Sequence, residues 1–249
     1  MIAVAVGYAI YACRRGLGWR YLGLGALAWV VTVALKFAWA IPVNTPVYQW
    51  LYQVLPETLA GISFYVYVGL LTGVFEVGVV WLVMRYTRLG RVTWEQALAF
   101  GIGFGSVEAL LLGFGGLGAA LAALISPAQL PLGPAELAQM NDVWYQLAPI
   151  AERFFAVLVH VLSNALIFYA VATRKPGWFW LAFLYKSGID AVAAGAQLLG
   201  WTGMPWLWAV EGVVALWGVA GWLGTRQVAR CYPWDLPENG ALEVMEPAE

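Results

Sequence analysis

Charged side chains are scarce in this sequence. Only 11% of its 249 residues are Asp, Glu, Lys or Arg, whereas 62% are hydrophobic. A soluble domain carries about 25% charged residues, so a soluble chain of this composition would lack polar surface. The formal net charge of −1 also excludes the basic field that binds nucleic acid. The solvent that suits this composition is lipid, and we predict an all-α, polytopic bundle of membrane-spanning helices.

Cysteine and histidine are also scarce, with two cysteines and one histidine in the chain. The two cysteines, Cys13 and Cys231, lie near opposite ends without a C-x-x-C spacing, which is more typical of inert residues than of a disulfide or metal site. Neither H-E-x-x-H nor G-x-S-x-G occurs, so the common zinc-protease and serine-hydrolase patterns are missing. No basic region precedes the apolar first dozen residues, which argues against a cleaved signal peptide.

Apolar runs divide the sequence into about seven spans, because a spanning helix needs roughly 20 apolar residues. The first run is short, and the fourth is long enough to be tilted or kinked. Turn-forming stretches are expected at 42–46, 127–134 and 200–205. We predict one transmembrane bundle over residues 1–230 and a disordered cytoplasmic tail over 231–249. The runs cover residues 1–13, 21–41, 59–84, 95–125, 146–172, 177–199 and 206–224.

The positions of Lys and Arg indicate the orientation of the spans. Cations lie in the connections after the first, third, fifth and seventh runs, and the other three connections contain none. The positive-inside rule therefore predicts a multi-pass cell-membrane protein with its N-terminus outside and its C-terminus in the cytoplasm. The cations of these connections are Arg14, Arg15, Arg20, Arg85, Arg88, Arg91, Arg174, Lys175, Arg226 and Arg230.

Five ionisable residues lie deep inside the predicted spans. Glu108, His160, Lys186 and Asp190 share a central depth on three consecutive spans, and Glu76 lies in the inner half of the third span. A charge at the bilayer centre costs roughly 2.5–3.5 kcal/mol, so such residues face a protein interior and often carry function. We predict that these five residues form one polar site.

Four other ionisable residues lie closer to the span ends. Lys36 and Glu211 are each about one turn from an end, and we expect both to reach the interface by snorkelling. Glu152 and Arg153 lie in the second turn of the fifth span and are placed to support the polar site. Buried pairs of this kind can also neutralise each other as simple contacts between helices.

Helical spacing predicts which polar residues share a face. Arg153 and His160 are seven residues apart, which places them about 20° from each other on one face. Asn164 follows His160 by four residues and extends this stripe. Lys186 and Asp190 are also four residues apart and can form an ion pair within the sixth span.

The residue types of this site suit more than one chemistry. Glu76 and Glu108 have no obvious partner, and a carboxylate in an apolar cavity can take a proton from water for hydrolysis of a peptide bond. A nearby cation can stabilise the oxyanion. The same residues could instead relay protons in a transporter. We predict no cofactor; zinc held by Glu76, Glu108, His160 and Asp190 is a weakly supported alternative.

Three segments follow one another in an order that is found in a known family. They are Gly73-Val-Phe-Glu76-Val77, Phe104-Gly-Ser-Val-Glu108 and Lys186-Ser-Gly-Ile-Asp190, with Glu152-Arg153 before the last. Over roughly residues 60–195 the chain resembles the YhfC family of predicted intramembrane proteases. That family is a branch of the superfamily that contains the CAAX prenyl endopeptidases and PrsW.

The resemblance implies roles for the matching residues. The superfamily motifs are a Glu-Glu pair followed by Arg or Lys, then F-x-x-x-H or F-x-x-x-E, then H-x-x-x-N or H-x-x-x-D. By this resemblance Glu76 activates water with help from Glu108, whose motif begins at Phe104, and Asp190 belongs to the motif that steadies the oxyanion. Val77 stands where the second Glu is expected, and Lys186 stands where the His is expected.

These departures leave three functions open. The first is an intramembrane endopeptidase that acts on a membrane-embedded or membrane-proximal peptide, with His160 or Lys186 taking over the lost imidazole's role. The second is an inactive homologue that binds a membrane segment, a lipid or a partner complex. The third is a proton-coupled transporter, against which the lack of a clear internal repeat counts. All three place the protein in contact with the lipid bilayer and none with nucleic acid.

Overall fold

Every regular element of the computed structural model is a helix within the residues that it describes, which are 1–125, 142–201 and 203–233. The predicted all-α fold is therefore confirmed. The third span is continuous but changes its winding in the middle, where a π-helical turn separates two α-helical parts. The elements are α1 (Ile2–Arg14), α2 (Trp19–Val54), α3 (Glu57–Thr72), η1 (Gly73–Gly78), α4 (Val79–Tyr86), η2 (Arg88–Gly90), α5 (Trp94–Ile125), α7 (Val143–Thr173), α8 (Pro176–Leu198) and α9 (Met204–Cys231).

Five helical segments of the described chain are long and apolar enough to cross a membrane. They are α2, the continuous segment from α3 to α4, α5, α7 and α9. The other two predicted spans correspond to α1, an apolar helix of 13 residues, and to α8, which has 23 residues and carries Lys186 and Asp190 near its middle. The predicted turn at 127–134 and most of the predicted tail lie outside the described residues.

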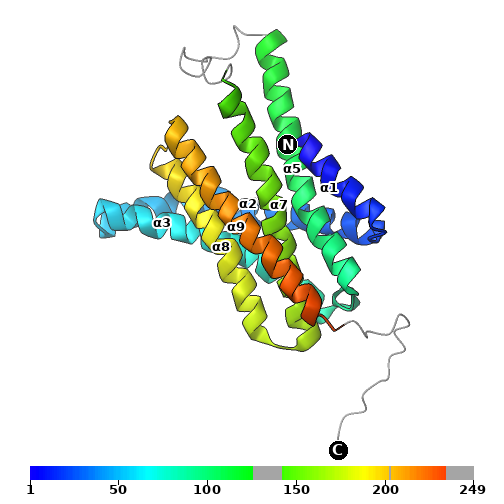
Figure 1. Cartoon of the computed structure of the whole chain (residues 1–249). Coiled ribbons are helices and arrows are strands. Elements are labelled where there is room, and N and C mark those ends of the chain that lie inside the picture. The colour runs from blue at the N-terminus through cyan, green and yellow to red at the C-terminus, as the bar shows by residue number, and fades with distance from the viewer. Residues whose placement is uncertain (126–141, 202, 234–249) are drawn as a thin grey trace, which may run out of the picture.

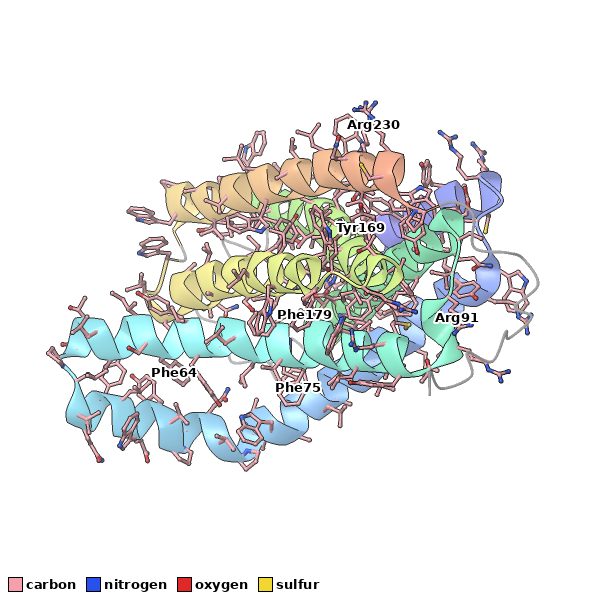
Figure 2. The ribbon with its side chains drawn as sticks, turned by 90° about the horizontal axis from the view of Figure 1, so that it is seen from below. Phe64, Phe75, Arg91, Tyr169, Phe179 and Arg230 are labelled. Atoms are coloured by element: carbon pink, nitrogen blue, oxygen red, sulfur yellow. The ribbon has the colours of Figure 1, made fainter. Side chains whose placement is uncertain are left out.

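The helices form a bundle around α7. Figure 1 shows α7 between α5 and α9, with α1 beside α5, while α2 and α3 cross behind this group. Seen from below in Figure 2, α2 and α3 run next to each other along one side of the molecule, and α8 lies next to α3. Of the three helices that carry the predicted central residues, α5 packs on α2, α8 packs on α3, and α7 contacts η1 and α4.

The second span differs from its prediction. The stretch from Pro42 to Pro46 was expected to be a turn, but both prolines lie inside α2, which has 36 residues and continues to Val54. Membrane helices tolerate proline because neighbouring groups satisfy the freed backbone, and α2 bends along its length in Figure 2. The consequence is that Lys36 lies at the middle of this helix and not near its end.

Glycines bring α5 into direct contact with its neighbours. A Cβ atom at Gly25 would meet the carbonyl of Phe100, and one at Gly103 would meet the carbonyl of Leu22, so α2 and α5 touch backbone to backbone. On another face of α5, a Cβ at Gly105 would lie 3.1 Å from the Cβ of His160. Small residues thus allow these helices to cross closely.

Candidate functional site

Glu76 is positioned by the π-helical turn in the third span. Such turns insert an extra residue and are frequent at functional sites, because they re-aim the side chains around them. A Cβ at Gly73 would meet the hydroxyl of Ser187 and lie 2.8 Å from the ring of Phe183, so η1 packs directly on α8. Glu76 is consequently 4% exposed and faces the middle of α8.

Two lysines from different helices hold the Glu76 carboxylate. Lys36 Nζ lies 2.5 Å from Oε1, and Lys186 Nζ lies 3.5 Å from Oε2. Lys36 also donates a hydrogen bond to Thr72 Oγ1 over 3.4 Å. The expectation that Lys36 snorkels to the interface is wrong, because α2 continues past Pro42 and places this lysine at mid-helix. The expectation that Glu76 lacks a partner is also wrong, because each of its oxygen atoms faces a lysine.

Glu108 forms a second cluster with two residues of α7. Arg153 Nη1 lies 2.6 Å from Oε1, and His160 Nε2 lies 2.6 Å from Oε2. The predicted common face of Arg153 and His160 is confirmed, since both reach the same carboxylate. Arg153 also pairs with its neighbour Glu152. The expectation that Glu108 is unpaired is therefore wrong: both of its oxygen atoms have partners.

The surroundings of His160 fix its ring on the α5 side of α7. The ring is 2% exposed and packs against Phe104, with 5.2 Å between the ring centroids. Asn164 Nδ2 donates to the carbonyl of His160 over 2.9 Å. Asn164 thus holds the backbone of His160 by a hydrogen bond, and Phe104 packs against the His160 ring.

The predicted ion pair within α8 is present. Lys186 Nζ lies 3.0 Å and 3.3 Å from the two carboxylate oxygens of Asp190. Because Lys186 also approaches Glu76, it connects α8 to the third span. Lys186 is buried, whereas 29% of the Asp190 side chain is exposed. The open side of Asp190 faces a cavity.

A polar cavity of about 440 Å³ joins the two clusters. It extends along α8 from Lys186 to Gln197, about 16 Å at the rise of an α-helix, toward the end of the bundle where α8 ends and α7 begins. Glu76 and Asn164 do not line it, because they lie behind the residues that do. The ionisable side chains on its wall are Lys36, Glu108, Glu152, Arg153, His160, Lys186 and Asp190.

Glu211 lies outside this cavity. The prediction that its side chain reaches the membrane interface is wrong. Its exposed fraction is 8%, and its Oε2 atom has no hydrogen-bond partner among the described residues. The reason is the close contact between α9 and α7, in which a Cβ at Gly218 would lie 2.7 Å from the Cβ of Phe155. The side of α9 that carries Glu211 is therefore covered.

The donor set of this site does not fit a metal ion. Within the described residues, no three His, Cys, Asp or Glu side chains are grouped closely enough to hold one. A divalent cation needs several free anionic or neutral donors. Here Glu76 faces two ammonium groups, and Glu108 faces a guanidinium and an imidazole. Because these carboxylates are already paired with positive groups, the predicted zinc alternative is not supported.

Sequence reasoning found most of this site but missed two members. The five predicted central residues and the supporting Glu152, Arg153, Asn164 and Phe104 all lie in or directly behind the two clusters. Lys36 and Thr72 were missed. A spacing signal exists for Thr72, which precedes Glu76 by four residues on the same span, but not for Lys36, which lies on another helix.

Comparison with known proteins agrees with this picture. The chain is 28% identical over 162 residues to an uncharacterized membrane protein, YhfC, of Bacillus subtilis (strain 168). This match covers 54% of the chain and 62% of the relative, less than two thirds of the relative's length. No solved structure matches the chain. The family model described as YhfC intramembrane metalloprotease matches residues 1–214, and the chain therefore belongs to the YhfC family.

Proposed function

We propose that this protein is an intramembrane peptidase in which Glu108 activates water without a metal ion. The observation that carries this proposal is the position of Glu108. Its carboxylate is fixed by Arg153 and His160, yet 21% of the side chain remains open to the polar cavity. A water molecule bound there would lie beside a carboxylate–imidazole pair, an arrangement that suits general-base catalysis.

The proposed reaction needs one base and one oxyanion partner. The water on Glu108 gives its proton to the Glu108–His160 pair, and its oxygen attacks the carbonyl carbon of the peptide. The Lys186 ammonium, on the cavity wall, stabilises the oxyanion that forms. When the C–N bond breaks, the pair returns the proton to the leaving nitrogen, which restores the starting charges.

In this proposal Glu76 has a different role from the one that the resemblance implies. It does not line the cavity, and it lies between the Lys36 and Lys186 ammonium groups. Without this carboxylate between them, the buried Lys186 and the half-buried Lys36 would repel each other with no compensating charge. Glu76 therefore positions Lys186, while Glu108 contacts the water.

The shape of the cavity indicates an extended, membrane-proximal substrate segment. Its wall is aliphatic between the charged residues, with Leu71, Val159, Ile189 and Val214 as contributors. It extends toward the end of the bundle that the positive-inside rule places outside. A helical substrate must unwind before its backbone carbonyl can approach Lys186, and backbone groups can leave helical structure only in such a polar space.

The test is cleavage of membrane-embedded reporter peptides by the purified protein in lipid nanodiscs. Glu108→Gln should lower the turnover number by about 100-fold or more, the usual contribution of a general base. Glu57→Gln, the same change in the exposed first turn of α3, should leave it unchanged. Turnover should also persist with a zinc chelator. Equal turnover by the parent and Glu108→Gln would overturn the catalytic role, and loss on chelation would overturn the metal-free mechanism.

A second candidate is binding without hydrolysis. It is favoured by the completeness of the ion pairs, because a carboxylate that accepts from both a guanidinium and an imidazole is stabilised as an anion and is a weak base. In this case the parent protein would retain a photo-crosslinking transmembrane peptide without cleaving it. Lys186→Ala should abolish that retention, and steady hydrolysis by the parent would exclude this candidate.

A further inference from the structure

A second hollow lies on another face of α7 and differs in character from the polar cavity. It has a volume of about 850 Å³ and is bounded by α1 on one side and α9 on the other, with α5 and α7 as its floor. Figure 1 shows α1 and α9 on opposite sides of α5 and α7. Because its wall is made almost entirely of apolar side chains, we refer to it as the apolar groove.

The length of the apolar groove matches one leaflet of a bilayer. Along α9 its wall runs from Val219 to Ala229, which corresponds to about 15 Å. The hydrocarbon core of a bilayer is about 30 Å thick. A transmembrane helix would need the whole of that thickness, whereas the acyl chains of one lipid need half. The volume also lies within the range of about 300–1,000 Å³ that is usual for small-molecule sites.

Two arginines stand at one end of the apolar groove. The Arg226 guanidinium lies 4.8 Å from the ring of Trp222, and the Arg15 guanidinium lies 5.7 Å from the ring of Tyr11. Both aromatic rings are part of the groove wall, on α9 and α1 respectively. Neither arginine forms an ion pair with a carboxylate of the described residues, so their charge is available to a ligand.

The first turns of α5 place both arginines at the same end. Tyr232, just after α9, packs against Trp94 at the start of α5. Ala12 and Leu17, on either side of Arg15, pack with Ala99 of α5. The apolar groove therefore has a charged rim at the end of the bundle where the cations gather, and an apolar interior that extends from that rim toward the middle.

We propose that the apolar groove binds a phospholipid with an anionic headgroup, with the headgroup phosphate between Arg15 and Arg226 and the acyl chains along α9. Basic residues between helices at the cytoplasmic side are a recognised way to hold anionic headgroups. A lipid in this place would fill the space between α1 and the rest of the bundle. The polar cavity takes no part in this lipid binding.

The test is native mass spectrometry of the purified protein with phosphatidylglycerol or phosphatidylcholine of equal chain length. The parent should retain phosphatidylglycerol in preference. Each of Arg15→Gln and Arg226→Gln should weaken it roughly fivefold, the effect of about 1 kcal/mol per basic residue. Arg85→Gln is the matched control, because Arg85 also stacks on an aromatic ring, Trp81, but neither Arg85 nor that ring lines the groove.

A second pair of variants tests whether the apolar groove must be open for a lipid to bind. Gly7 lines the groove and a Cβ atom there would meet nothing within 4 Å, so Gly7→Leu should occupy part of the groove and weaken the binding of both lipids. Gly115→Leu, which is equally open but lies elsewhere, should not change retention. Equal retention by the parent, the arginine variants and Gly7→Leu would overturn the proposal. Displacement of the lipid by inorganic phosphate, or by a transmembrane peptide that crosslinks along α9, would also overturn it.

Discussion

At the scale of single residues, the two clusters place positive groups around one buried carboxylate, Glu76, and one partly exposed carboxylate, Glu108. Lys36 and Lys186 serve Glu76, while Arg153 and His160 serve Glu108. Removing one partner of such a pair leaves a charge in an apolar place, which is more costly than removing both. The contribution of each residue can therefore be measured by comparing single and paired changes.

Lys36→Met should destabilise the protein by about 1–3 kcal/mol, less than the cost of a fully orphaned charge because Lys186 still faces Glu76. The paired change Lys36→Met with Glu76→Gln should recover most of this loss. Lys175→Met, at the exposed start of α8, is the control and should have an effect of less than about 0.5 kcal/mol. Thermal unfolding in detergent is measured for the parent, the control, Lys36→Met, Glu76→Gln and the double variant. Additive effects of the two single changes would contradict the coupling.

Spacing within one helix was a reliable guide to the site, and pairing between helices was not. The i,i+7 relation of Arg153 to His160 and the i,i+4 relation of Lys186 to Asp190 are confirmed. The partners of Glu108 could not be identified from the sequence. Several cations lie at compatible depths, and the sequence does not specify which helices are neighbours. The sequence therefore predicts which residues gather at this depth, but not which of them contact each other.

At the scale of elements, the sequence rules for soluble helices failed twice. Proline usually ends a helix in a soluble protein, but Pro42 and Pro46 are tolerated inside α2. The helix therefore continues, and Lys36 lies at its middle and not near its predicted end. The π-helical turn at Gly73–Gly78 has no reliable sequence signature. It depends on packing against Ser187 and Phe183, which are more than 100 residues away.

The crossing of α2 and α5 provides a test at this scale. Gly25→Ala should destabilise the protein by about 1–3 kcal/mol, because its Cβ would collide with the backbone of Phe100, which cannot rotate away. Gly23→Ala, two residues earlier on the same helix, meets nothing within 4 Å and should be neutral or slightly stabilising. The difference in unfolding temperature between the two variants is the measurement. Equal temperatures would show that the helices do not approach this closely.

At the scale of the whole molecule, the orientation in the membrane stays a prediction that two natural cysteines can check. Cys13 at the end of α1 and Cys231 at the end of α9 are both exposed. Six predicted spans separate them, so both should face the cytoplasm. A membrane-impermeant maleimide should label both in inverted vesicles and neither in intact cells, with Cys13→Ser and Cys231→Ser separating the two signals. Labelling of either cysteine from outside would contradict the orientation.

The ion pairs also follow the order in which the chain is made. Lys36 of α2 pairs with Glu76 of the next span, and Glu108 of α5 pairs with Arg153 of α7, which follows it. Lys186 and Asp190 neutralise each other within α8. Lys36, Glu108 and Lys186 thus each find a partner in the next charged span or within their own span. The same contacts that build the site therefore give each of these charges a partner of opposite sign early in insertion.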